Sequence, residues 1–150
     1  MLEGYAVWDP TCRINAPCGS AEVTEPGGGS LIVRLAFSEV VDGIAEDLLI
    51  TFTSHVALMS HEEFAHPWCD DGELALPTIG GKWGRATHPT LRVNPSAWIE
   101  SFSGDRLAHV DRRDVQHYRF VTLDRTVDVL ATETPALKWT AARPHHPGAQ

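Results

Sequence analysis

Residues 31–37 read LIVRLAF and residues 47–59 read DLLITFTSHVALM, and these two stretches decide the fold class. Apolar side chains recur at every second position from Leu31 to Phe37, which places them on one face of a β-strand. The second stretch alternates in the same way and is rich in β-branched residues. With a turn at Asp42-Gly43 between them, the two stretches predict a long antiparallel hairpin or meander.

A second hairpin is predicted from HYRFVTL at residues 117–123 and TVDVLAT at residues 126–132. Before it, Asn94 suits a helix N-cap, Pro95 the first helical position and Gly104 the exit, which predicts one short helix near residues 95–103. Strands dominate and no βαβ alternation occurs. We therefore expect a mainly β fold, or an α+β fold with few short helices, built as an antiparallel barrel or sandwich of two or more hairpins.

A chain of 150 residues corresponds to about one domain, so residues 1–150 are expected to form one unit. Residues 1–30 are expected to be irregular, with PGGGS as a break before the first strong strand, and residues 144–150 to form a frayed tail. The first residues lack the pattern of a secretory signal, and no apolar stretch is long enough to span a bilayer. Three cysteines, an odd number, predict reduced thiols and a cytoplasmic location. Ten Arg against two Lys is typical of a GC-rich bacterial genome.

The formal net charge of −8 argues against general binding to nucleic acid or to anionic membranes. The charge is unevenly distributed, because residues 1–75 contain 13 acidic and two basic residues, whereas residues 76–150 contain seven acidic and ten basic residues. An acidic docking face for a cationic partner is one interpretation of this asymmetry. The other is that the two halves pack together and neutralise each other locally.

Residues 60–84 lack strand or helix periodicity and predict a long loop, a kind of segment that often carries function. HEEFAH, at residues 61–66, fails as a metalloprotease motif because its histidines are five positions apart and cannot share a helix face. A looser metal site for zinc or another divalent transition metal is predicted from imidazole and carboxylate ligands, namely His55, His61, His66 and Asp70. A solvated acidic loop is the alternative.

The same loop also predicts a surface for binding a basic protein partner. Trp68 and Trp83 flank its Pro/Gly-rich part, where a tryptophan serves either to anchor the loop or to recognise a partner. Acidic side chains surround Trp68 and would complement a basic surface. The residues predicted to bind the partner are Glu62, Glu63, Trp68, Asp70, Asp71, Glu73 and Trp83.

Hydrolytic chemistry has little support in the sequence. Cys69 could serve as a nucleophile with His117 or His109 as its base, but the acids beside Cys69 disfavour its thiolate form. We therefore predict no catalytic residue and no cofactor. The function expected is non-enzymatic protein–protein contact, for example as an acidic immunity protein that neutralises a basic toxin. The alternatives are a metal-binding protein or metalloenzyme that uses residues 55–71, and a structural homo-oligomer such as a homodimer paired through strand edges.

Overall fold

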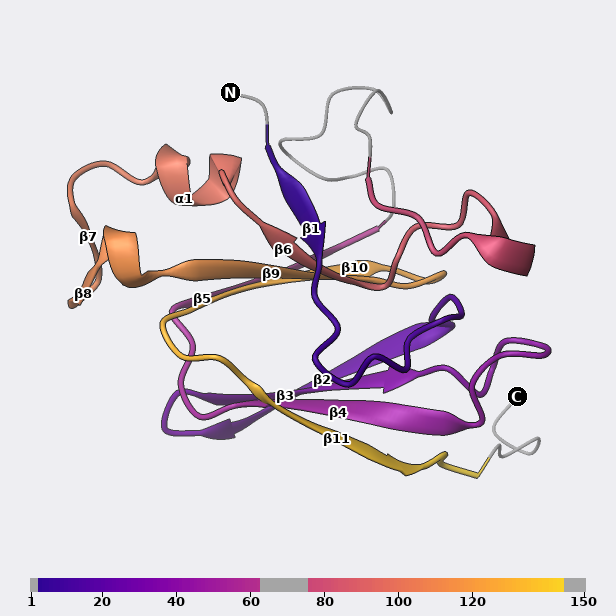
Figure 1. Cartoon of the computed structure of the whole chain (residues 1–150). Helices are drawn as coiled ribbons and strands as arrows, with labels where there is room; N and C mark the ends of the chain where they lie inside the picture. The colour runs from indigo at the N-terminus through magenta and orange to yellow at the C-terminus, as the bar shows by residue number, and fades with distance from the viewer. Residues whose placement is uncertain (1–2, 63–75, 145–150) are drawn as a thin grey trace.

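The computed structural model describes residues 3–62 and 76–144, and the structural statements below refer to these ranges. In them the chain forms two large antiparallel sheets that face each other (Figure 1). The first sheet contains, in spatial order, β1 (Tyr5–Val7), β6 (Thr90–Val93), β9 (Gln116–Val121), β10 (Thr126–Ala131) and β5 (Ala57–His61). The second contains β11 (Ala136–Ala141), β4 (Glu46–Phe52), β3 (Ser30–Ala36) and β2 (Ser20–Gly27).

Both predicted hairpins are confirmed. In β3 and β4, Val33 lies opposite Ile50, and in β9 and β10, Tyr118 lies opposite Val129. Among the described residues neither sheet closes on itself, so the architecture is a sandwich and not a barrel. The remaining elements are short and lie between the strands of the two large sheets. They are η1 (Gly81–Trp83), α1 (Ala97–Ser101), η2 (Arg112–Asp114), and a small two-stranded sheet of β7 (Arg106–Leu107) and β8 (Val110–Asp111).

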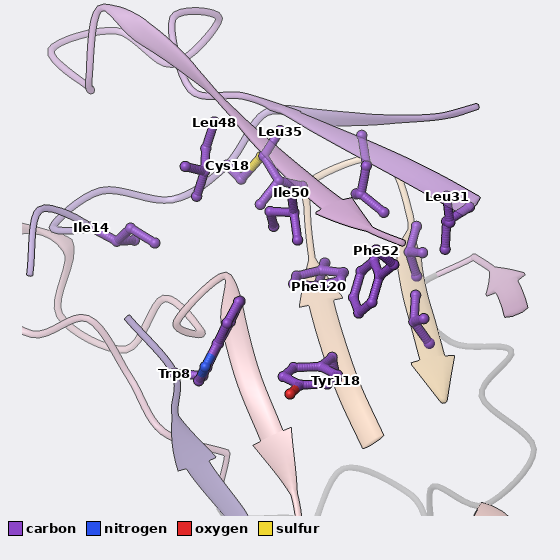
Figure 2. Packing of buried hydrophobic residues seen from close by; sticks show 14 of the residues in the cluster. Trp8, Ile14, Cys18, Leu31, Leu35, Leu48, Ile50, Phe52, Tyr118 and Phe120 are labelled. Atoms are coloured by element: carbon purple, nitrogen blue, oxygen red, sulfur yellow. The ribbon is translucent and has the colours of Figure 1, made fainter. Parts of the chain in front are cut away.

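The main core fills the space between the two sheets (Figure 2). The alternating apolar positions from Leu31 to Phe37 are fully buried, as the sequence pattern predicts. From the facing sheet, Tyr118 packs against Phe52 with ring centroids 5.5 Å apart, and Trp8 meets the Tyr118 ring edge-on at 5.0 Å. Such aromatic pairs add to the free energy gained by burying apolar surface.

A smaller core covers the outer face of the first sheet. Trp98 of α1 packs there with Leu107 and Val115, and all three lie against Leu130 of β10. Buried side chains therefore lie on both faces of β10, where every residue from Thr126 to Ala131 is buried. This second layer allows polar side chains of β9 and β10 to be buried on the outer face.

The expectation that residues 1–30 are irregular is wrong, because β1 and β2 lie in this segment. In β2, Ala21 and Val23 point toward the core while Glu22 and Thr24 point outward. Small and polar residues conceal this alternation in the sequence. PGGGS is the turn of the β2–β3 hairpin, in which Gly28 and Gly29 adopt positive φ angles of 64° and 84° that glycine tolerates without strain.

Two predicted boundaries also differ from the structure. Residues 47–59 form two strands, because β4 ends at Phe52 and the chain crosses to the other sheet before β5 begins. The helix is confirmed but shorter than predicted, and its N-cap is Ser96 and not Asn94. The Ser96 hydroxyl oxygen accepts a hydrogen bond from the Ile99 backbone N–H at 3.1 Å, which satisfies one free donor of the first turn.

Several predictions fall on residues outside the described ranges: most of the long loop, at 63–75, and nearly all of the C-terminal tail, at 145–150. Within the described ranges, no helix has the length and hydropathy needed to cross a bilayer. Cys12 and Cys18 are free thiols in the structure, the first exposed and the second buried.

Candidate functional site

A cluster of buried charged side chains lies on the outer face of the first sheet. Strand register places Arg119 of β9 directly opposite Asp128 of β10. The Arg119 Nε–H donates to Asp128 Oδ1 at 2.8 Å, and the side chains are 2% and 0% exposed. The second partner of Arg119 is Glu3, at 3.3 Å from Nη2, and its side chain is also 2% exposed. Charges this deeply buried are retained only when they are paired and hydrogen-bonded.

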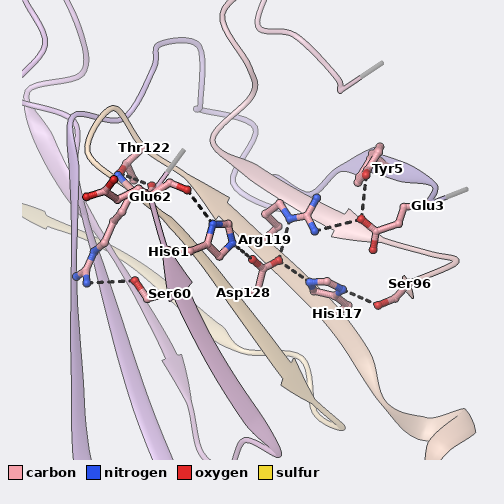
Figure 3. A network of polar contacts seen from close by, with 11 residues as sticks. Glu3, Tyr5, Ser60, His61, Glu62, Ser96, His117, Arg119, Thr122 and Asp128 are labelled. Atoms are coloured by element: carbon pink, nitrogen blue, oxygen red, sulfur yellow. Dashed lines mark hydrogen bonds and ion pairs between the residues drawn. The ribbon is translucent and has the colours of Figure 1, made fainter. Parts of the chain in front are cut away.

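Two histidines complete the set of groups around Asp128 (Figure 3). The His117 Nε2 lies 2.6 Å from Asp128 Oδ1, and the His61 Nε2 lies 3.0 Å from Oδ2. The hydrogen bond to Asp128 raises the pKa of His61, which burial alone would lower. Asp128 therefore joins the end of β5 to β9 and, through Arg119 and Glu3, to the N-terminal segment.

Ser96 extends this cluster into a Ser–His–Asp chain. Its hydroxyl lies 2.7 Å from His117 Nδ1, on the opposite side of the ring from Asp128. Because Nε2 faces a carboxylate, we assign the ring proton to Nε2, so that Nδ1 accepts the hydrogen of the serine hydroxyl. A cavity of about 310 Å³ adjoins Ser96 and His117. No sequence motif indicates this arrangement, because Ser96, His117 and Asp128 are apart in the sequence and meet only in the folded chain.

Three features of the chain favour a structural role over catalysis. In the serine protease triad the serine contacts Nε2 and the aspartate contacts Nδ1, which is the reverse of the arrangement here. The Ser96 oxygen already caps α1, and its residue is only 4% exposed. The next backbone N–H, that of Ala97, donates to Glu3 Oε2 at 3.0 Å and so does not point freely toward a developing oxyanion.

The structure separates the two described members of the predicted metal site. His55 contacts the β2–β3 hairpin, with Nδ1 2.6 Å from the Gly29 carbonyl oxygen and Nε2 3.2 Å from Glu25 Oε1. His61 instead contacts Asp128. The other two predicted ligands, His66 and Asp70, lie outside the described residues. In the ranges that are described, no three His, Cys, Asp or Glu side chains form a group able to hold a metal ion.

Of the residues predicted to bind a protein partner, the structure describes Glu62 and Trp83. Glu62 is exposed and follows β5, and Trp83 is half-buried in η1. Trp83 lines a groove of about 460 Å³ between η1 and the β3–β4 loop. The remaining predicted residues lie outside the described ranges, namely Glu63, Trp68, Asp70, Asp71 and Glu73. Cys69, the candidate nucleophile, also lies outside the described ranges.

The acidic first half of the chain is partly neutralised by local pairing. Arg34 pairs with the buried Asp47 at 2.7 Å, and Arg13 pairs with Glu46 at 2.5 Å. Two further pairs join the halves, between Arg119 and Glu3 and between Arg143 and Glu22. These contacts favour mutual neutralisation over a continuous acidic face in the described part of the chain. Glu39 and Asp42 of the β3–β4 loop form no ion pair with a described base.

Compared with protein-family models, with curated proteins and with solved structures, the chain gives no significant match.

Removing the charge of Asp128 is expected to destabilise the fold strongly. Asp128→Asn leaves the buried Arg119 guanidinium without its closest counter-charge, which typically costs about 3–5 kcal/mol in the free energy of unfolding. The measurement is urea denaturation followed by circular dichroism. Glu46→Gln is the control: it removes a solvent-exposed ion pair and should change stability by no more than about 1 kcal/mol. Equal effects of the two substitutions would contradict a central role for Asp128.

Ser96→Ala tests the structural interpretation of the Ser–His–Asp chain. Loss of the N-cap is expected to lower the free energy of unfolding by about 1 kcal/mol. The wild-type protein is expected not to react with a fluorophosphonate probe, which labels activated serines. Ser101→Ala is the control, since Ser101 lies in the same helix and donates only to the Trp98 carbonyl oxygen. Covalent labelling of Ser96, seen by mass spectrometry, would show that the serine is a nucleophile.

Two histidines are expected to give pH-dependent stability of opposite sign. The folded-state pKa of His61 is raised above its ordinary value of 6.5, so its contribution is complete below that pH and is lost as pH rises through the folded pKa. Burial lowers the pKa of His88, so stability is lost as pH falls below 6.5.

Denaturation of His61→Gln and His88→Gln from about pH 5 to about pH 8 separates these effects. His61→Gln should flatten the decline in stability on the alkaline side. His88→Gln should flatten the decline on the acidic side. Identical pH profiles for the wild type and both variants would refute these assignments.

Proposed function

We propose that the protein is a non-enzymatic binding domain that contacts a basic protein partner through loops at one end of the sandwich. The observation that carries this proposal is the groove of about 460 Å³ at Trp83. Its walls come from three segments that are far apart in the sequence: Asn15 lies between β1 and β2, Asp42 and Gly43 follow β3, and residues 79–83 include η1. The β3–β4 loop and the η1 loop extend from the same end of the sandwich (Figure 1).

The surface around the groove has the composition of a protein-contact site. Val41, beside the groove residue Asp42, is 82% exposed, which is unusual for a large apolar side chain. Trp83 offers a large ring, and the Lys82 ammonium lies 5.1 Å from its centre. A half-buried tryptophan beside exposed apolar surface is typical of residues that contribute most to binding energy. Loops held on a rigid sandwich commonly carry such sites.

A basic partner suits the charges near this end. Glu39 and Asp42 add carboxylates from the β3–β4 loop, and Lys82 is held by the Asp42 carbonyl oxygen at 3.4 Å. The four acids at positions 63–73 belong to the set predicted to bind the partner, but they lie outside the described residues. Acidic surfaces accelerate association with cationic proteins and make it sensitive to salt. An immunity protein that binds a basic toxin in the cytoplasm is the concrete form of the proposal.

Trp83→Ala and Asp42→Asn test the proposed surface, with Leu123→Ala as the control. Leu123 is also apolar and is 69% exposed, but it lies in the β9–β10 turn. We expect wild-type protein and the Leu123 variant to capture the same basic protein from lysate of the producing cell. With that partner purified, titration calorimetry should show at least about tenfold weaker binding for Trp83→Ala.

Higher ionic strength should weaken wild-type binding, and Asp42→Asn should reduce that salt dependence. Retention of the partner by Trp83→Ala, or capture that is indifferent to salt, would contradict the proposal. Light scattering of the purified protein separates self-association from binding of a different protein.

A further inference from the structure

Strand β6 departs from the pattern of a sandwich strand. Its outward residues Leu91 and Val93, which lie opposite Arg119 and His117, are apolar and are 0% and 2% exposed. The residues that face the other sheet are polar, namely Thr90 and Arg92, which lie opposite the core residues Phe120 and Tyr118. A cation on the inner face of a sandwich strand conflicts with packing, and such conflicts concentrate at functional sites.

Arg92 is held in place but its charge is not neutralised by a described carboxylate. Its Nη2 donates to the side-chain oxygen of Gln116, and its guanidinium carbon lies 5.3 Å from the centre of the Tyr118 ring. The Arg92 Nε is buried and has no hydrogen-bond partner among the described residues, and neither has the Tyr118 hydroxyl. Buried donors without partners are rare, and each calls for a physical explanation.

An open surface pocket of about 400 Å³ is lined in part by Arg92, at the edge of the first sheet formed by β1. Its lining consists of Arg92, Asn94 and the four residues 5–8. Trp8 contributes an aromatic ring that is fixed edge-on against Tyr118. In Figure 2 the Tyr118 hydroxyl points away from Phe120, on the side of the core where Trp8 lies. The cavity thus combines a positioned cation, an amide and an aromatic wall.

We propose that this cavity binds a small organic carboxylate with a flat apolar body. The Arg92 guanidinium would form charge-assisted hydrogen bonds with the carboxylate, because its planar fork of donors matches the two oxygens. The Asn94 amide is a further donor, and Trp8 with the side of β1 covers the apolar body. Aromatic walls with few convergent polar groups are typical of small-molecule sites. The site is separate from the groove at Trp83 and does not depend on the proposed protein partner.

Benzoate is the probe for this site, with benzamide as a neutral molecule of the same shape. In ¹H–¹⁵N correlation spectra of the wild-type protein, benzoate is expected to shift the signals of residues 5–8, the Trp8 indole and residues 92–94. Benzamide is expected to cause smaller shifts at the same concentration. This comparison uses the unaltered chain, so it remains decisive if a variant fails to fold.

Arg92→Gln should weaken benzoate binding by about tenfold or more, as expected for the loss of a charge-assisted hydrogen bond. Arg112→Gln is the matched control, because Arg112 lines the neighbouring cavity at Ser96, which shares Asn94 with this one. Equal binding of benzoate and benzamide, shifts that map around Arg112, unchanged affinity in Arg92→Gln, or no shift at millimolar benzoate would each overturn the proposal.

Discussion

The first sheet depends on the hydrogen bonds that the buried Asp128 carboxylate accepts. One oxygen accepts hydrogen bonds from Arg119 and His117, and the other accepts from His61, so three strands meet at one buried anion. Such an anion is stable only because its partners replace the water that it loses. Removing one partner leaves the others buried and unsatisfied, which strongly destabilises the fold.

The charged cluster around Asp128 is buried only because a second layer, the smaller core at Trp98, Leu107 and Val115, covers the outer face of the first sheet. Arg119 and Asp128 point away from the main core, and without α1 and the N-terminal segment they would face solvent. Glu3 supplies the second carboxylate for Arg119, and the chain from Ser96 to His117 links the helix to the same network. The helix is too short to be stable alone, so these contacts and the burial of Trp98 hold it in place. The loop end and the β1 edge carry the two pockets from which the proposals are argued.

Prediction from sequence succeeded where apolar side chains recur at every second position of a strand. The alternation from Leu31 to Phe37 predicted both the strand and its buried face, and the second hairpin was found in the same way. Prediction failed for β2, where alanine and threonine give a weak alternation, and at the break between β4 and β5, where the pattern continues across a change of sheet. The helix N-cap was misplaced because Asn94 and Ser96 are both good caps, and sequence alone does not distinguish between them.

For the candidate sites, the sequence indicated that Trp83 and its loop were of interest, but it did not identify Ser96, Arg92 or Asp128. Their roles arise from strand register: Arg119 meets Asp128, and Arg92 meets Tyr118, only when β6, β9 and β10 lie side by side. The sequence by itself determined the strands, their buried faces and the unequal distribution of charge, because these follow from local periodicity and composition. Tertiary structure alone decided which charges neutralise each other and which polar groups line the same pocket, because such contacts join residues up to 121 positions apart and form only when the sheets pack.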